Sequence, residues 1–252
     1  LIILNSPIKT RAVARQVAID AFLKLTNDEW LLFLDDDIIL DKKWWIKASK
    51  FINISKVGII VGYVKPTDKF VIEYINIRNL NPEKSFEISF TGRGFTGDTL
   101  IRREALIRVK EIYGIIPPYL HEYEDAWLFH KIRCLGYDYV IIFTNSYHLG
   151  IQRLSILSAI KNPILAYKMG FNTDAYIPNT INHYKSLRNA IKFILSYVDD
   201  SINHIISFYK KYGIINNVLS MEMRILGTYI IWLIMKMLYG NPGDPCKNNI
   251  NT

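Results

Sequence analysis

The segment Trp30-Leu-Leu-Phe-Leu-Asp-Asp-Asp37 joins an apolar run directly to three consecutive carboxylates. An apolar run of this length predicts a short strand that is buried on both faces of a parallel sheet. Ligands of open α/β sheets bind just beyond the carboxyl ends of such strands. If the backbone stays extended, Asp35 and Asp37 project to the same side, because side chains alternate along a strand. Neighbouring carboxylates disfavour each other's ionisation unless a cation is close, so the triplet predicts a divalent metal site.

A plainer interpretation of the triplet stays open. The three carboxylates can form a solvated acidic turn, with Asp41 capping a helix that begins at Lys42. The two interpretations differ in whether other polar groups of the chain converge on the triplet.

The first 150 residues alternate between strand-like and helical patterns, which predicts an α/β fold with a largely parallel sheet and flanking helices. Strands are predicted at 1–4, 31–34, 57–64, 70–77, 86–90 and 137–143, and helices at 9–24, 42–51, 99–113 (after a strand end) and 124–135. Beyond residue 150 the patterns are helical, at 154–169, 182–198, 202–212 and 218–239. We therefore predict a first domain at 1–152, an all-helical region at 153–245 and a polar tail at 246–252.

The net charge of the 252-residue chain is +8 and is unevenly distributed. Residues 151–252 contain 11 Lys and Arg against 5 Asp and Glu, whereas the first 150 are nearly neutral. A basic helical region predicts an anionic partner, with a lipid surface or nucleic acid as candidates and a merely soluble surface as the alternative. The uncharged stretch 225–235 is far shorter than the ~20 residues that a membrane-spanning helix needs. It predicts a core helix or a helix lying in the membrane interface.

Two cysteines, Cys134 and Cys246, are too few for a disulfide framework and lack the spacing of a metal site. We therefore predict a reducing, cytoplasmic setting, with peripheral attachment to the cytoplasmic face of a membrane if the basic region binds lipid. No secretory leader is recognisable. Because the first residue is Leu, we expect either a fragment or a processed start.

The segment Gly92-Arg-Gly-Phe-Thr-Gly97 matches the pattern G-x-G-x-x-G. A dinucleotide site would also need an acid about twenty residues later, where the chain instead has the loop 113–118. A glycine loop whose amides face an anion together with Arg93, Arg102 and Arg103 fits better. The alternative is that these arginines only decorate a surface helix.

Three further positions suggest polar chemistry. Asp125 shares a helical face with apolar residues, so Glu124-Asp125 would start a helix at the rim of the sheet, where a carboxylate can act as a general base or merely cap the helix. His148 follows a predicted strand end, as the Asp triplet does, which suggests a metal ligand. Arg11 and Arg15 are four residues apart on one helix and face one way, toward phosphate or toward Asp20.

In this order, these pieces resemble the family 2 glycosyltransferases of GT-A fold. The resemblance rests on Arg15, on 33–38 with its Asp triplet, on Gly97-Asp-Thr-Leu-Ile-Arg-Arg-Glu-Ala-Leu106, on Glu124-Asp125 with Arg133 and Gly136-Tyr137, and on His148. It covers about residues 5–150. Family members usually carry about two further strand–helix units ahead of the point where Leu1 stands, so the nucleotide-binding segment would be missing from this chain.

The resemblance implies roles for these residues. Asp35, Asp36, Gly97, Arg102 and Arg15 would bind a UDP- or GDP-linked sugar, and Asp37 with His148 would hold Mn²⁺ or Mg²⁺ on the diphosphate. Asp125, beside Glu124, would take the proton from an acceptor hydroxyl that attacks the anomeric carbon with inversion. The expected acceptor is a glycan or a lipid-linked sugar, and no nucleic-acid partner is expected.

Two other functions stay open. A non-catalytic GT-A-like module would bind a glycan, a membrane or a protein without turnover. A nucleotide-cofactor oxidoreductase would rest on the glycine segment alone.

Overall fold

A computed structural model describes residues 10–67, 86–88, 97–120, 123–149, 164, 167, 187–212, 216–240 and 246. They fall into two compact units. The first contains 10–65, 86–88, 97–120, 123–149 and 246, and the second contains the other described residues. The change of unit after Leu149 lies close to the predicted boundary at 152. Cys246, however, belongs to the first unit and not to a separate tail.

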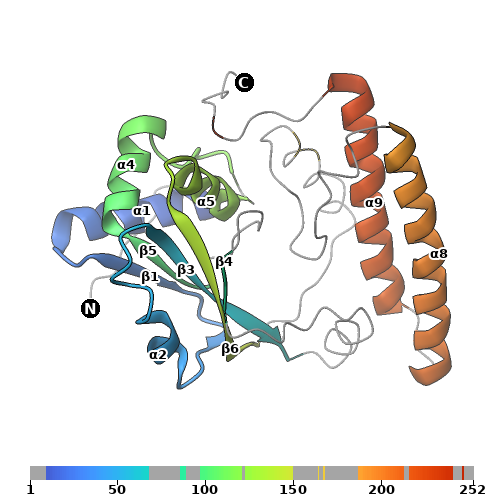
Figure 1. The fold of residues 1–252 in the computed structure, drawn as a ribbon, viewed down its shortest axis with the longest axis horizontal. Helices are drawn as coiled ribbons and strands as arrows, with labels where there is room; N and C mark the ends of the chain where they lie inside the picture. The colour runs from blue at the N-terminus through green and yellow to red at the C-terminus, as the bar shows by residue number, and fades with distance from the viewer. Residues whose placement is uncertain are drawn as a thin grey trace. The chain divides into compact units, whose positions relative to one another are not determined.

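The first unit is an α/β fold built on a six-stranded sheet (Figure 1). The strands are β1 (Trp30–Leu34), β2 (Ile38–Ile39), β3 (Val57–Pro66), β4 (Phe86–Ile88), β5 (Asp98–Arg102) and β6 (Asp138–His148). Their order is β1-β5-β3-β6-β2, with β4 paired to β6. The predicted strands at 1–4 and 70–77 lie outside the described residues.

The sheet is not the largely parallel one that the sequence predicted. The pairings β1–β5, β3–β5, β2–β6 and β4–β6 are all antiparallel. β1 and β3 do run in the same direction, but β5 lies between them in the opposite direction. The alternation of strands and helices could not reveal this, because the neighbour of β1 lies more than sixty residues later in the chain. β1 is also not buried on both faces, since Leu32 and Leu34 are 41% and 48% exposed.

Helices cover the sheet on both sides (Figure 1). On one side lie α1 (Arg11–Leu25), α4 (Arg103–Tyr113) and α5 (Glu124–Cys134), and on the other lies α2 (Trp44–Ala48). α1 begins after Thr10, whose hydroxyl accepts a hydrogen bond from Val13 N. α2 is shorter than the predicted helix 42–51. Its buried Trp44 and Ala48 pack against apolar side chains of the sheet, which forms the core on that side.

The two outermost strands in this order, β1 and β2, come close to each other near the end of the long strand β6. Only residues 35–37 separate β1 from β2, although these strands stand at opposite ends of the sheet order. Three residues span about 10 Å at most. The end of β6, which pairs with β2 through Ile38 and His148, must therefore lie close to the end of β1.

The second unit contains two long helices, α8 (Leu187–Tyr212) and α9 (Asn216–Tyr239). The sequence predicted separate helices at 182–198 and 202–212, but the chain is helical without a break from Leu187. Nothing between them is a Gly or Pro that would stop a helix. Of the predicted helix 154–169, only residues 164 and 167 are described. Among the helices that the structure describes, none combines the length and the apolar character needed to cross a bilayer.

The two cysteines form a disulfide within the first unit. Cys134, the last residue of α5, is bonded to Cys246, and their Cα atoms are 5.3 Å apart. The prediction of a reducing setting rested on the small number of cysteines, and this bond removes that basis.

Candidate functional site

The Asp triplet forms a turn directly after β1. Asp35 continues the ladder, because its N–H donates a 2.8 Å hydrogen bond to Gly97 O. The backbone then turns, and Ile38 N donates to Asp35 O at 3.2 Å. The premise that the strand stays extended through Asp37 is therefore wrong. The turn is needed because the chain must leave β1 and pair with β6.

Asp37 and His148 are in direct contact, as their joint assignment to one site requires. His148 Nε2 lies 3.2 Å from Asp37 Oδ2, and Leu149 N donates to Asp37 O at 2.8 Å. The side chains of Asp37 and His148 are 42% and 23% exposed. The pair is thus held by the β2–β6 register and still accessible to a ligand.

Arg15 connects the triplet to the start of α5. Its guanidinium forms an ion pair with Glu124, whose side chain is almost fully buried. Burial raises the pKa of Asp35 above its ordinary value, Arg15 and Arg11 oppose that rise, and Asp37 and Asp36 add to it. Arg15 is therefore ion-paired with Glu124 and near enough to Asp35 to lower the pKa of that carboxyl.

The start of α5 is held in an unfavourable backbone conformation. Tyr123, which precedes Glu124, has φ +67°, a left-handed conformation that costs a non-glycine residue energy. Tyr123 is buried, which fixes it there. Asp125 is 7% exposed, and its Oδ1 accepts a 2.7 Å hydrogen bond from Ala126 N. The strain falls directly before the two acids to which we assigned catalytic roles.

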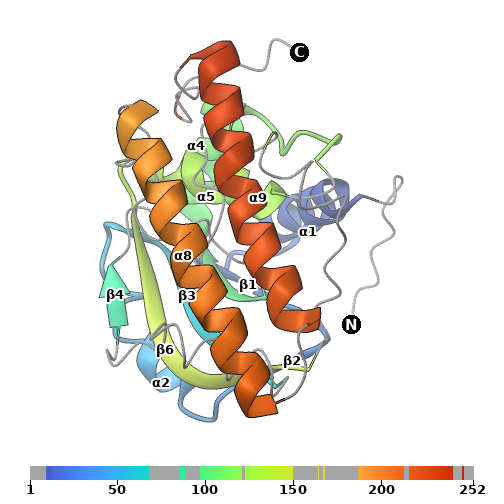
Figure 2. The ribbon, with the colours of Figure 1, turned by 90° about the vertical axis from the view of Figure 1, so that its right-hand side faces the viewer.

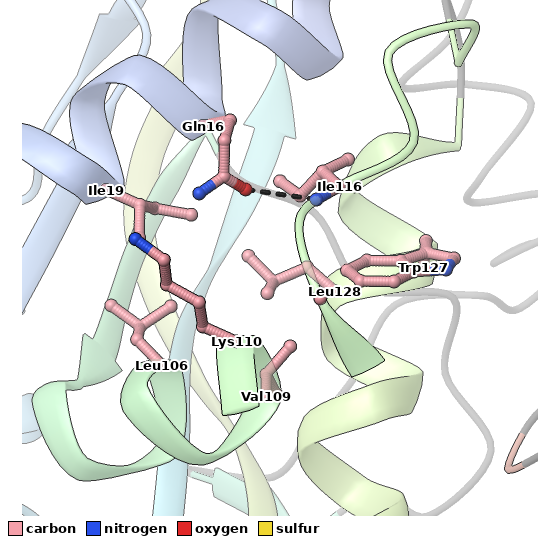
Figure 3. A pocket seen from close by; sticks show the side chains of 9 residues that line it. Gln16, Ile19, Leu106, Val109, Lys110, Ile116, Trp127 and Leu128 are labelled. Carbon is pink, nitrogen blue, oxygen red and sulfur yellow. Dashed lines mark hydrogen bonds between the residues drawn. The ribbon is translucent and has the colours of Figure 1, made fainter. Parts of the chain in front are cut away.

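A second contact from α1 fixes the loop that leads to α5. Gln16, next to Arg15, accepts a 3.0 Å hydrogen bond from Ile116 N through its Oε1 (Figure 3). The small pocket around it is lined mainly by Ile19, Leu106, Val109, Ile116, Trp127 and Leu128. The lining joins three helices, and its one cation, Lys110, is ion-paired with Asp20 at 2.7 Å. The pocket serves packing, and it positions Arg15 through its neighbour.

Asp98, for which the sequence predicted no role, is a further carboxylate at this edge of the sheet. It opens β5 opposite Leu34, the residue before Asp35. Its side chain is fully buried, its Oδ2 accepts a 3.0 Å hydrogen bond from Trp44 Nε1, and no group in the described part of the chain donates to its Oδ1. A Cβ at Gly62 would overlap Asp98 Oδ2, so glycine is required there. Burial is the main cause that raises the pKa of Asp98 to about 7. Hydrogen bonds from Trp44 and Gly62 lower this pKa, and the nearby charge of Asp35 raises it further.

Asp98→Asn is expected to remove a pH dependence of stability. In the unfolded chain the pKa of this carboxyl returns to 3.8, so the folded protein binds the extra proton between that value and about 7. The free energy of unfolding therefore falls as pH rises through this window and levels off above it. Asn keeps an oxygen acceptor for Trp44 without a buried charge, so its stability advantage over the wild type should grow by roughly 2–3 kcal/mol between pH 5 and pH 8. Urea unfolding at both pH values measures this. Asp36→Asn, at an exposed neighbour, controls for the substitution itself.

The structure does not bring Arg102 to this site. Arg102 ends β5 opposite Trp30, about 13 Å along the strand from Asp98. Its guanidinium donates to three backbone carbonyls of the 52–57 segment at 2.8–2.9 Å and lies over the Trp30 ring. Arg103 likewise donates to carbonyl oxygens at the C-terminal end of α1 and just after it. Both are structural, because a guanidinium whose donors are satisfied by carbonyls is not available to phosphate. Of the glycine segment, only Gly97 is described.

Among the residues that the structure describes, the site has an excess of negative charge. Asp35, Asp36 and Asp37 lie together, and the described guanidinium groups that act on Asp35 are those of Arg11 and Arg15. Arg15 is shared with Glu124, so the carboxylates are not fully neutralised. Such a site favours a divalent cation.

The residues present fit a metal that is shared with a substrate. In the described ranges, no three His, Cys, Asp or Glu side chains gather as a complete metal-binding group. Asp37 and His148 supply one carboxylate and one imidazole at an accessible position. Mg²⁺ and similar ions are commonly held by one or two protein groups together with substrate phosphates and water. Two protein ligands are therefore sufficient for an ion that arrives with a diphosphate.

Comparison of the sequence with protein-family models finds no match, and comparison with curated proteins finds none either.

Proposed function

We propose that this protein is an inverting glycosyltransferase that uses a UDP- or GDP-linked sugar and a divalent metal. The observation that carries the proposal is that Arg15, ion-paired with Glu124, also acts electrostatically on Asp35. This arginine joins the acidic turn after β1 to the start of α5. Asp37, in the same turn as Asp35, contacts His148, and Asp125 follows Glu124 in the first turn of α5. A donor diphosphate and an acceptor hydroxyl need this separation of roles.

Each group has a task in the proposed reaction. Asp37 and His148 hold the metal, which when bound supplies positive charge to the leaving nucleoside diphosphate. Arg15 and Arg11 attract the phosphates, and Asp35 orients the donor. Asp125 accepts the proton of the acceptor hydroxyl from its place in the first turn of α5. Glu124 holds Arg15 and is thus a positioning residue.

Asp37→Ala is expected to remove the metal-dependent part of nucleotide binding. Titration calorimetry of UDP and of GDP, with Mn²⁺ and with EDTA, measures the affinities. The wild type should bind one nucleotide at least tenfold more tightly with Mn²⁺, and the variant should lose about 10–100-fold of that affinity. Asp28→Asn, an equal charge change on the exposed segment before β1, should bind as the wild type does.

Two results would count against the proposal. Equal Mn²⁺-dependent binding in Asp37→Ala would contradict the metal assignment. Metal-dependent nucleotide binding without transfer to any glycan or polyprenyl-phosphate acceptor would favour the non-catalytic module.

A further inference from the structure

The helices α8 and α9 pack against each other as an antiparallel hairpin (Figure 2). Their contact includes a polar cluster, in which buried Glu222 Oε2 accepts hydrogen bonds from Tyr197 at 2.8 Å and from Ser201 at 2.7 Å. These three residues define the side on which each helix faces the other. The remaining sides can then be assigned from the helical repeat of about 100° per residue.

α8 carries an exposed apolar stripe that does not face α9. The stripe consists of five residues that are between 44% and 64% exposed: Ile191, Leu195, Ile202, Ile206 and Tyr209. At 100° per residue they fall within an arc of about 60°, centred about 130° past the contact side. Solvent exposure of so many large apolar groups in one line is unfavourable and indicates a partner.

α9 carries a matching stripe. Met223, Ile230, Ile234 and Met237 are between 41% and 59% exposed. They also fall within an arc of about 60°, centred about 90° past the contact side. Read along each helix from its N-terminus, both stripes are rotated away from the contact side in the same direction. The two helices themselves are antiparallel. Both stripes therefore lie on one face of the hairpin, which we call the apolar face.

Basic side chains border the apolar face. Arg188, Lys192 and Lys210 are exposed and lie along the edge of the α8 stripe, with Asp199 between them. Because three cations stand against one carboxylate, this edge has a net positive charge. An apolar face with Lys and Arg along its α8 edge fits an anionic lipid surface, where the apolar groups enter the acyl boundary and the cations reach the headgroups. A second copy of the chain would bring the same cations and offers no such complementarity.

We propose that the apolar face of the α8–α9 hairpin seats the protein on a membrane surface that contains anionic lipid. The helices lie in the interface and do not cross the bilayer. This docking is independent of sugar transfer, so either inference can fail while the other stands.

Flotation of the full chain with lipid vesicles tests the docking. Vesicles of pure phosphatidylcholine are compared with vesicles that contain about 30% phosphatidylglycerol, at low and high salt. The wild type should float with the anionic vesicles, at least tenfold less with the neutral ones, and less at high salt, since screening weakens the attraction. Ile202→Glu/Ile206→Glu should lower anionic partitioning at least tenfold.

The control is Asn203→Glu/Ser207→Glu, which adds the same charge one residue further along α8, outside the apolar stripe but close to its basic edge. Its loss of anionic partitioning should be clearly smaller than that of Ile202→Glu/Ile206→Glu, because the apolar groups stay in place. Leu195→Gln is a milder change at the most exposed residue of the α8 stripe, and it should lower anionic partitioning several-fold. This variant replaces the double variant if circular dichroism shows that the double variant does not fold. Absence of wild-type flotation, or equal loss in the control, overturns the proposal. A wild-type dimer that Ile202→Glu/Ile206→Glu dissociates, without vesicle binding, overturns it in favour of self-association.

Discussion

Asp125→Asn is expected to lower the rate of sugar transfer by about 10²–10⁴-fold, the usual contribution of a general base. The amide keeps the shape of the side chain and an oxygen that can accept the hydrogen bond from Ala126 N. It cannot take a proton from the acceptor hydroxyl. Nucleotide binding should stay within about threefold of the wild type, because Asp125 is not assigned to the diphosphate.

Release of UDP or GDP from the donor in the presence of glycan and polyprenyl-phosphate acceptors measures transfer, and calorimetry measures donor binding. Glu104→Gln is the control, since Glu104 is also an acid in the first turn of a helix but lies in α4 and has no assigned role. Its transfer rate should equal that of the wild type. Transfer at more than about a tenth of the wild-type rate in Asp125→Asn would mean that another residue is the base.

Arg15→Met is expected to destabilise the protein by about 3–5 kcal/mol, because it leaves the carboxylate of Glu124 buried without its cation. Met preserves the apolar part of the side chain, so the loss reports the charge. Glu124→Gln in the same chain should recover at least half of the loss, since the buried charge is then gone too. Urea unfolding of the four proteins forms a double-mutant cycle.

Arg11→Met controls for a general effect of removing charge from α1. Arg11 also faces Asp35 but is exposed, so its loss should cost less than about 1 kcal/mol in stability. Both arginine variants should bind the nucleotide more weakly. A double variant no more stable than Arg15→Met would show that the ion pair does not contribute as we infer.

The parts of the site that the sequence predicted are those with local signals. Asp35 follows an apolar run, Glu124 begins a helix and His148 comes at the end of a strand. Strand ends and helix starts can be recognised from neighbouring residues alone. In the structure Asp37 contacts His148, and Arg15 contacts Glu124.

The parts that the sequence did not predict depend on distant contacts. Arg102 belongs to the same sequence motif as Gly97, but the five residues of β5 place it at the far end of that strand, away from the site. Asp98 became a buried carboxyl because Trp44 and Gly62 meet it from two other elements. The strand directions follow from pairings between segments far apart in the chain. Spacing within one segment contains none of this information.

The bond between Cys134 and Cys246 makes a ring of everything between them, which includes β6 and both long helices. A protease that cuts once inside this ring opens it but releases no fragment. The cut protein stays one covalent molecule until a reductant separates its pieces. The two long helices are thus covalently linked to the first unit at two points, so a single break in either connection does not free them.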